Sequence, residues 1–437
     1  MGSSLTDMAL AKHVVQQLSQ QFLDWTHQRD KRGKTTDYME ACKDAVGEVV
    51  EDELMPQQQY SYPLRTQNAA PDEKIDGSFW LKHVIPKMAT YVALEHNTFE
   101  ICMNKNRPHR VGWFAVGDWG EWSDPLELLA KRMAVLATSF TPSFVMALGD
   151  NFYPTGALKP GDAEFRMWEK VFIEKYPTLY VPWKVVLGNH DYMGNPQCQI
   201  DFTTHEANPK GLWQMPSNQY SWSMPCGPNG ETIAFIAFDS NAVQFSVRNT
   251  HPHRLEEYPK DLEWLKAELT KHKDATWKVY FAHHPFYTKG KGHLNEARCL
   301  RSRQYENVAG TATYPGMDLE KVLVEHGVDA VFSGHEHIMQ QHKGKGDILH
   351  FVSGATVESH WYKGRIDEEP MDWYLENKTG FIAADVSSDP SSGESELRVR
   401  FVDSTTGHIL HQVSRVKKVA KPQEQQVDAP PAPAATS

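Results

Sequence analysis

The sequence predicts an α/β domain preceded by a helical extension and followed by a disordered tail. From residue 110 onward, short apolar runs alternate with helical patterns, which is typical of a sheet flanked by helices. Polar residues follow five of these runs directly, at the strand ends where open α/β sheets place ligands. The 437 residues are enough for one large domain with attachments. We expect a helical extension over residues 1–107, the α/β domain over 108–416 and the tail over 417–437.

The extension is predicted to be helical because its first apolar residues recur every three or four positions. The resulting stripe consists of Met8, Ala11, Val15, Leu18, Phe22 and Trp25. Its opposite face is rich in Gln rather than in Lys and Arg, so we expect the stripe to dock on the main domain rather than on a second copy of the chain or on a membrane. Further helices are expected over residues 37–54 and after Ser78, which can cap a helix.

The α/β domain is predicted from apolar runs bounded by loops. Strands are expected over residues 110–116, 143–148, 183–187, 232–238, 277–281 and 330–332. Helices are expected over residues 125–138 and 261–273. Four later runs, 348–352, 380–386, 397–402 and 409–413, come without long helices and predict an antiparallel continuation. Beyond Lys418, a composition rich in Pro, Ala and Gln predicts disorder.

Composition excludes several classes of protein. Lys and Arg number 45 against 56 Asp and Glu, a formal charge of −11, which argues against a nucleic-acid binder. The sequence shows neither a run of about 18 apolar residues nor the pattern of a signal peptide, so we expect a cytoplasmic protein. Five irregularly spaced cysteines fit reduced thiols better than a disulfide framework. Cys198 and Cys226 are the one pair that merits a check.

The first residues match the pattern for N-myristoylation of Gly2. This modification would give peripheral membrane contact, whereas an ordinary N-terminus or an expression leader is the alternative. One acyl chain binds membranes only marginally. A second signal would have to come from the basic residues between Arg29 and Lys34, which Asp24 and Asp30 dilute.

Five loops that follow predicted strands carry residues that bind metals. They are Gly117-Asp118-Trp119-Gly120, Gly149-Asp150-Asn151-Phe152-Tyr153, Gly188-Asn189-His190-Asp191, Ala282-His283-His284-Pro285 and Gly334-His335-Glu336-His337. Each motif alone is weak, but all five follow strands of one domain, so we expect them to converge along one sheet edge. Mixed Asp, Asn, His and Tyr ligands suit iron, zinc or manganese. Their number predicts two metals, which together clamp a phosphoryl group and activate a water.

In this order, the five motifs resemble those of the metallophosphoesterases, and more closely those of the purple acid phosphatases of the small, tartrate-resistant type. The resemblance runs from about residue 110 to about residue 402 and implies a four-layer αββα sandwich built on two mixed sheets. Other metallophosphoesterases usually carry Asp-x-His in the first motif. Here Asp118-Trp119-Gly120 lacks the histidine, and Tyr153 replaces it as a ligand. A phenolate is a hard anionic donor that favours ferric iron.

The resemblance also implies which residues hold each metal. The first metal, Fe(III), takes Asp118, Asp150, Tyr153 and His337. The second metal, Fe(II), Zn or Mn, takes Asp150, Asn189, His283 and His335. Asp150 bridges the two. The family pattern places its histidine ligand two residues before Pro285, which selects His283 rather than His284.

Three further roles are carried over from the resemblance. His190 donates a hydrogen bond to the substrate phosphate, and Asp191 holds the His190 ring in the required tautomer. His293 helps to protonate the leaving alcohol. The implied reaction is the hydrolysis of phosphomonoesters through attack by a metal-bound hydroxide.

Two other functions remain open at this stage. One is a manganese- or zinc-dependent phosphodiesterase of the same superfamily, and the other is a non-catalytic, membrane-associated scaffold that retains the fold. The segment 296–316 also has two interpretations. Its Arg298, Arg301 and Arg303 would clamp an extended phosphorylated substrate, or they belong to a solvated charged loop, which is the interpretation that we favour.

Overall fold

The computed structural model describes residues 109–157, 167–176, 179, 181–244, 247, 250–290, 293–301, 304–306, 313–315, 317–360, 371–389 and 391–419. All of them belong to one compact unit, Ile101–Ser437. The predicted helical extension, the Gly2 motif and the tail beyond residue 419 lie outside the described residues. The predicted domain limits therefore stay predictions.

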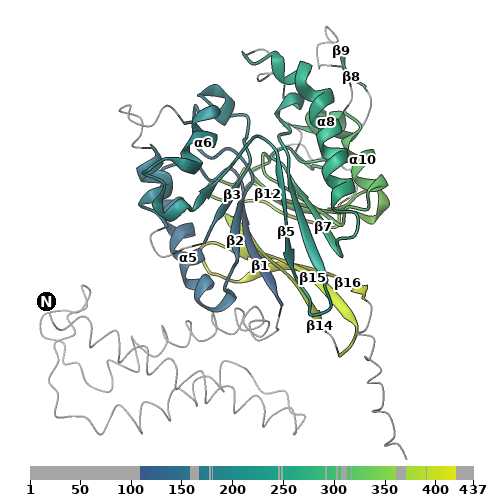
Figure 1. The fold of residues 1–437 in the computed structure, drawn as a ribbon. Helices are drawn as coiled ribbons and strands as arrows, with labels where there is room; N and C mark the ends of the chain where they lie inside the picture. The colour runs from purple at the N-terminus through teal and green to yellow at the C-terminus, as the bar shows by residue number, and fades with distance from the viewer. Residues whose placement is uncertain are drawn as a thin grey trace, which may run out of the picture. The chain divides into compact units, whose positions relative to one another are not determined.

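The described strands form two mixed sheets and one small hairpin (Figure 1). The first sheet contains β1 (Val111–Val116), β2 (Phe144–Ala147), β3 (Trp183–Val185), β4 (Trp213–Gln214), β14 (Gly380–Asp389), β15 (Glu394–Asp403) and β16 (Ile409–Lys418). The second sheet contains β5 (Tyr220–Pro225), β6 (Thr232–Ala237), β7 (Trp277–Phe281), β10 (Ala330–Ser333), β11 (Met339–Lys343), β12 (Leu349–Ser353) and β13 (Trp373–Leu375). The hairpin pairs β8 (Gln304–Glu306) with β9 (Thr313–Pro315).

Both sheets combine parallel and antiparallel strands: the first has its parallel strands on one side and its antiparallel strands on the other, and the second has a parallel centre with antiparallel strands on both sides. The first sheet has the order β16–β15–β14–β1–β2–β3–β4, in which β1 to β4 are parallel neighbours. The second has the order β13–β11–β12–β10–β7–β6–β5, in which β6, β7, β10 and β12 are parallel. The carboxyl ends of each parallel set therefore lie at one edge of its sheet, and this is where the predicted motifs begin.

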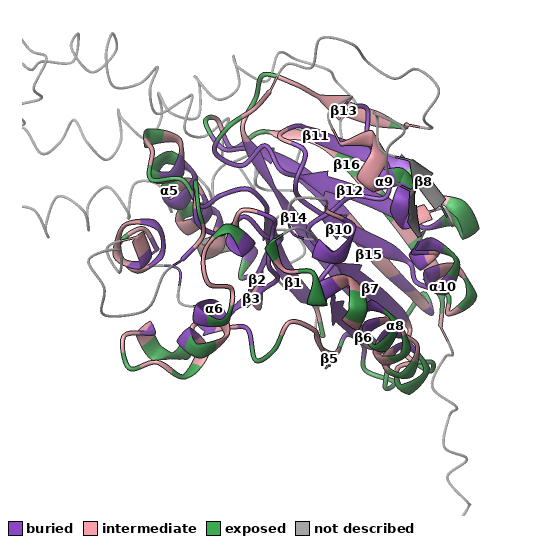
Figure 2. Ribbon diagram, turned by 90° about the horizontal axis from the view of Figure 1, so that it is seen from above, coloured by how far each residue is buried: buried purple, intermediate pink, exposed green. Residues whose placement is uncertain are grey.

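Helices cover the outer face of each sheet. They are α5 (Asp124–Phe140), α6 (Gln197–Asp201), α8 (His253–Lys271), α9 (Leu294–Arg301) and α10 (Leu319–Glu325). In Figure 1, α5 and α6 lie on one side of the paired sheets, and α8 and α10 lie on the other. Figure 2 shows that the exposed residues gather on these helices, whereas the strands between them are mostly buried. The predicted four-layer αββα sandwich is confirmed.

Three hydrophobic cores separate the four layers, and β1 shows why its sequence is apolar throughout. Phe114 and Val116 pack in the core beneath α5, whereas Val111, Trp113 and Ala115 pack in the core between the two sheets. Successive side chains of a strand point to opposite faces, so a strand covered on both sides needs an unbroken apolar run. A third core packs the second sheet against α8 and α10.

The predicted strands and helices exist, with three differences in detail. The run at 348–352 was expected to continue the fold in antiparallel fashion, which is wrong in part, because β12 lies between β10 and β11 and is parallel to β10. Helix α8 starts at His253, eight residues before the predicted start, and contains Pro259. The short or polar strands β4, β5, β8, β9, β11 and β13 were not predicted. Later strands β14, β15 and β16 are antiparallel, as expected.

Other sequence expectations concern membranes and cysteines. Among the described residues, no helix combines the length and the apolar character that a membrane crossing requires. Cys198, Cys226 and Cys299 are buried free thiols, so the Cys198–Cys226 pair is not a disulfide.

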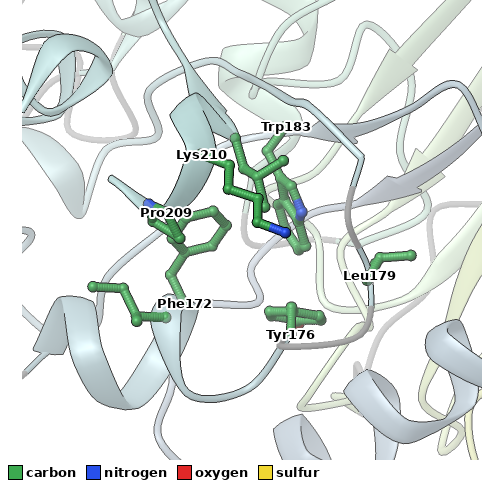
Figure 3. Close-up of a pocket in the computed structure, with 8 residues that line it drawn as sticks. Phe172, Tyr176, Leu179, Trp183, Pro209 and Lys210 are labelled. Atoms are coloured by element: carbon green, nitrogen blue, oxygen red, sulfur yellow. The ribbon is translucent and has the colours of Figure 1, made fainter. Parts of the chain in front are cut away.

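A cavity of about 280 Å³ lies on the outer side of the first sheet (Figure 3). Its walls are mainly apolar and aromatic and include Phe172, Tyr176 and Trp183, with Lys210 beside them. None of the predicted metal ligands lines this cavity, so it is separate from the site described next.

Candidate metal centre

The five motifs begin at strand ends of both sheets, not at one sheet edge as expected. Asp118, Asp150 and Asn189 follow β1, β2 and β3 of the first sheet, whereas His283 and His335 follow β7 and β10 of the second. The prediction of a single edge is wrong. The strands before the five motifs have similar apolar sequences, but they belong to two separate sheets. The site therefore lies where the carboxyl ends of two sheets meet.

Three of the predicted ligands adopt backbone conformations that are uncommon for residues other than glycine. The φ angles of Asp118, Asp150 and His335 are 56°, 49° and 70°, in the left-handed region. Residues in this region are strained, and they persist where the surrounding structure fixes them, often at functional sites. Close approach also explains the glycine before Asn189, because a Cβ atom at Gly188 would lie 2.1 Å from Oδ1 of Asp150.

The first cluster of donors surrounds the hydroxyl group of Tyr153. This oxygen lies 2.9 Å from Oδ2 of Asp150, 3.1 Å from Oδ1 of Asp118 and 3.2 Å from Nε2 of His337. Oδ1 of Asp118 is also 3.4 Å from Nε2 of His337. All four residues predicted to hold the first metal therefore come together, although they are far apart in the sequence.

The second cluster surrounds Nε2 of His283. This nitrogen lies 3.0 Å from Oδ1 of Asn189, 3.1 Å from Nδ1 of His335 and 3.6 Å from Oδ1 of Asp150. All four residues predicted to hold the second metal are again together. Asp150 belongs to both clusters and presents Oδ2 to the first and Oδ1 to the second.

The surroundings of His283 show that the second cluster fits a cation. Nδ1 of His283 lies 2.8 Å from the carbonyl oxygen of Leu148, which can only accept, so Nδ1 carries a proton and Nε2 is the nitrogen that can offer a lone pair to a cation. Nε2 faces the oxygens of Asn189 and Asp150, which are acceptors. His283 is fully buried. Buried lone pairs that face one another are unfavourable unless a cation or a proton lies between them.

Electrostatics lead to the same conclusion for the first cluster. Burial and then the nearby charges of Asp118 and Asp150 raise the pKa of Tyr153 well above its ordinary value. Burial also raises the pKa of Asp150, and the charge of Asp118 adds to this effect. A phenolate and two carboxylates can therefore be ionised together at this place only beside a strong positive charge.

His190 lies beside the first cluster, with its ring held by a backbone carbonyl. Nδ1 of His190 donates to the carbonyl oxygen of Pro154 at 2.6 Å, and the ring centroid lies 4.6 Å from that of Tyr153. The prediction that Asp191 holds this ring is wrong. Its side chain points into the protein instead, because the turn at 191–193 buries Asp191 completely while His190 stays at the surface of the site.

Asp191 accepts hydrogen bonds from the loops that carry the predicted ligands. Its carboxylate accepts from the backbone amide of Gly188 at 2.8 Å, from that of Asn151 at 3.1 Å and from the side chain of Gln199 at 2.7 Å. Asn151 and Gln199 also bond to each other at 3.0 Å. Asn151 and Gln199 were missed as supporting residues, although the position of Asn151 directly after Asp150 could have marked it.

Two further histidines lie next to the second cluster. The ring of His293 is centred 4.0 Å from that of His335, so the predicted residue does reach the site. Burial, together with the charge of His283, lowers the pKa of His293 to about 4, although Asp118 opposes this effect. His284 is fully buried and bonds through Nδ1 to the hydroxyl group of Ser240 at 2.8 Å. Its ring is centred 4.4 Å from that of His335.

The arginines of the segment 296–316 are partly described. Arg298 and Arg301 lie on α9, and Arg303 lies outside the described residues. The guanidinium group of Arg301 stacks on the ring of Tyr287 at 4.4 Å. Arg301 therefore packs within the fold. Neither of the two interpretations of this segment, a substrate clamp or a solvated loop, included this role.

Comparisons with known proteins agree with this geometry. The model of the calcineurin-like phosphoesterase family matches residues 114–339, just over half of the chain. The chain belongs to the calcineurin-like phosphoesterase family. The matched residues extend from β1 to β11 and contain all seven predicted metal ligands.

Named relatives of this phosphoesterase include purple acid phosphatases. Mouse tartrate-resistant acid phosphatase type 5 is 28% identical over 254 residues, which cover 55% of this chain and 71% of the relative. Purple acid phosphatase 17 of Arabidopsis thaliana is 24% identical over 317 residues, which cover 69% of this chain and 83% of the relative. These relatives confirm the resemblance stated above and place the phosphoesterase among the phosphatase hydrolases. The family implies a dinuclear metal centre.

One solved structure supports the fold of this phosphoesterase. GAP50, the anchor in the inner membrane complex of Plasmodium, superimposes with a TM-score of 0.55 at 20% sequence identity. The match covers 72% of this chain and 91% of that chain. At this identity the likeness shows a shared fold and nothing about activity.

Proposed function

We propose that the chain is a binuclear-metal phosphatase that hydrolyses phosphomonoesters. The observation that carries this proposal is the placement of Asp150, whose two carboxylate oxygens face two separate clusters of ligand atoms. A carboxylate in this position can bridge two cations. When bound, such a pair activates a water as the nucleophile and neutralises charge on the phosphoryl group.

The first cluster would hold ferric iron. Asp118, Asp150, Tyr153 and His337 supply hard oxygen donors and one imidazole. Without a cation the raised pKa of Tyr153 keeps the phenol protonated, so a metal that binds its phenolate has to offset both burial and two carboxylates. A trivalent ion does so better than a divalent ion. The second cluster, with the amide oxygen of Asn189 and the rings of His283 and His335, suits a divalent ion such as Fe(II), Zn or Mn.

His190 and His293 would handle the substrate. The bond from Nδ1 of His190 to Pro154 fixes its ring, so Nε2 is the nitrogen that remains for a phosphate oxygen, to which it donates when the ring is doubly protonated. His293 lies on the other side, against His335, where it would protonate the leaving alcohol. Its pKa of about 4 means that the ring is neutral before substrate binds. An anionic phosphate beside it would raise that pKa and favour the protonated form.

Hydrolysis of two model substrates tests this proposal. We expect metal-loaded protein to hydrolyse p-nitrophenyl phosphate faster than bis(p-nitrophenyl) phosphate between pH 4.5 and 8, and a chelator to abolish both activities. Faster hydrolysis of the diester would favour the phosphodiesterase. Protein that holds two metals per chain and hydrolyses neither ester would favour the non-catalytic scaffold.

Replacing Tyr153 tests the identity of the first metal. We expect Tyr153→Phe to remove the tyrosinate-to-iron charge-transfer band and to lower the iron content, because the variant keeps the ring and loses only the ligand oxygen. Tyr176→Phe is the matched control, since Tyr176 is a buried tyrosine that lines the separate cavity. Unchanged iron content and an unchanged spectrum in Tyr153→Phe would contradict iron at this position and favour a manganese or zinc enzyme.

A further inference from the structure

A short segment after β12 brings two unassigned residues beside the metal centre. Oε2 of Glu358 lies 3.7 Å from Nδ1 of His337, and Oε1 of Glu358 lies 3.0 Å from Nε2 of His360. The rings of His337 and His360 are centred 4.4 Å apart. The backbone amide of His360 donates to the carbonyl oxygen of His337 at 2.9 Å, which ties the segment to the motif. Glu358 therefore lies between two imidazoles.

The two nitrogens of His337 face different partners. Nε2 faces Tyr153 and Asp118 within the first cluster, so it is the nitrogen that would bind a metal. A neutral ring that offers Nε2 to a cation carries its proton on Nδ1. Among the described residues, Nδ1 is a buried atom without a hydrogen-bond partner, and Glu358 is the carboxylate that forms an ion pair with it.

We propose that Glu358 is a positioning residue for the first metal. It attracts the Nδ1 proton of His337, fixes the tautomer that presents Nε2 to the cation and makes that nitrogen a stronger donor. His360 holds the carboxylate in place from the other side. This inference rests on the proposed function, because it takes His337 to be a metal ligand.

Glu358 is too exposed for its ion pairs to stabilise the fold much, so a role in positioning His337 can be told apart from a role in folding. Its side chain is 55% exposed and that of His360 is 42% exposed. Exposed ion pairs contribute little to the stability of a fold. The 3.7 Å separation is longer than a hydrogen bond, and rotation of an exposed carboxylate can close the gap. The effect of Glu358 should therefore appear in metal retention rather than in the stability of the metal-free protein.

Variants of Glu358 test the inference through metal retention. We expect Glu358→Leu to lose metal to a chelator roughly 10- to 100-fold more readily than wild type, which is the usual effect of removing such a partner. Glu358→Gln should recover part of this loss, because its amide oxygen still accepts a proton from Nδ1. The metal-free form of each variant should unfold at the same temperature as metal-free wild type. Glu263→Leu, at an exposed position on α8, is the matched control.

Three outcomes would overturn the inference, and they can be told apart. If wild type holds two metals per chain and Glu358→Leu loses metal to a chelator no more readily than Glu263→Leu, only the role of Glu358 is refuted. Wild type without bound metal would refute the proposed function as well. Nδ1 of His337, Glu358 and His360 also lie close enough to hold a cation themselves. If wild type holds a third metal, and both Glu358→Leu and His360→Ala lose it, Glu358 binds a metal directly and does not position His337.

Discussion

Asp150→Asn is expected to lower phosphatase activity by more than about 100-fold, because the variant keeps one of the two oxygens that would bind the cations and loses the other. Removing a residue that only supports a metal ligand typically costs 10- to 100-fold. Loss of an oxygen that binds a cation directly should cost more. The amide nitrogen of the variant cannot bind a cation, so the protein should also retain fewer than two metals.

The same substitution should leave the metal-free fold at least as stable as wild type. Burial raises the pKa of Asp150 in the folded chain, so ionisation of this carboxyl group opposes folding. This loss of folding stability is absent below pH 3.8, the ordinary pKa of an aspartate. It grows as the pH rises from 3.8 towards the raised pKa of Asp150 in the folded chain. Asparagine has no such penalty. Metal-free Asp150→Asn should therefore gain stability over metal-free wild type near neutral pH and show little gain near pH 3.

Denaturation curves of the two metal-free proteins at several pH values measure this difference. Asp201→Asn is the control, because Asp201 is an exposed aspartate at the end of α6. A variant that is inactive and also less stable without metal would contradict the account. Such a result would mean that Asp150 supports the fold and that its loss of activity follows from unfolding.

Asp191→Ala is expected to destabilise the protein by roughly 3 to 5 kcal/mol. Asp191 is fully buried and accepts hydrogen bonds from Gly188, Asn151 and Gln199. Alanine would leave these donors unsatisfied, and each buried unsatisfied donor costs about 1 to 3 kcal/mol. Since Gly188 precedes Asn189 and Asn151 follows Asp150, metal retention should fall as well.

Chemical denaturation of metal-free protein measures this loss, with Asp201→Ala as the exposed control. The side chain of Asp201 accepts a hydrogen bond from the side chain of Gln197 at the surface. A loss below about 1 kcal/mol, combined with a shifted pH profile of activity, would contradict the structural role of Asp191. It would restore the earlier prediction that Asp191 acts on the ring of His190.

Local signals in the sequence were enough to find the residues that the structure gathers into the two clusters. Each motif consists of an apolar strand, a glycine or alanine, and a polar residue within a few positions, so a single stretch of chain defines it. The glycines follow from the same geometry, since Gly188 leaves room for Asp150. The resemblance to a known family then assigned each ligand to a metal.

Pairings between distant segments could not be predicted in the same way. The choice between one sheet and two depends on which strands become neighbours, and β1 and β7 have similar apolar sequences in different sheets. Short strands such as β4 have too few residues for a pattern. The role of Asp191 was missed because adjacent residues in a tight turn point in different directions, so its place beside His190 in the sequence was misleading.

Elemental analysis of the purified wild-type chain and of Asp150→Asn tests the central claim most directly. If two cations share the carboxylate of Asp150, wild type should contain two metal ions per chain, and the variant should contain one or none. An active wild-type enzyme with a single metal ion per chain, or an Asp150→Asn variant that retains two, would contradict the shared carboxylate.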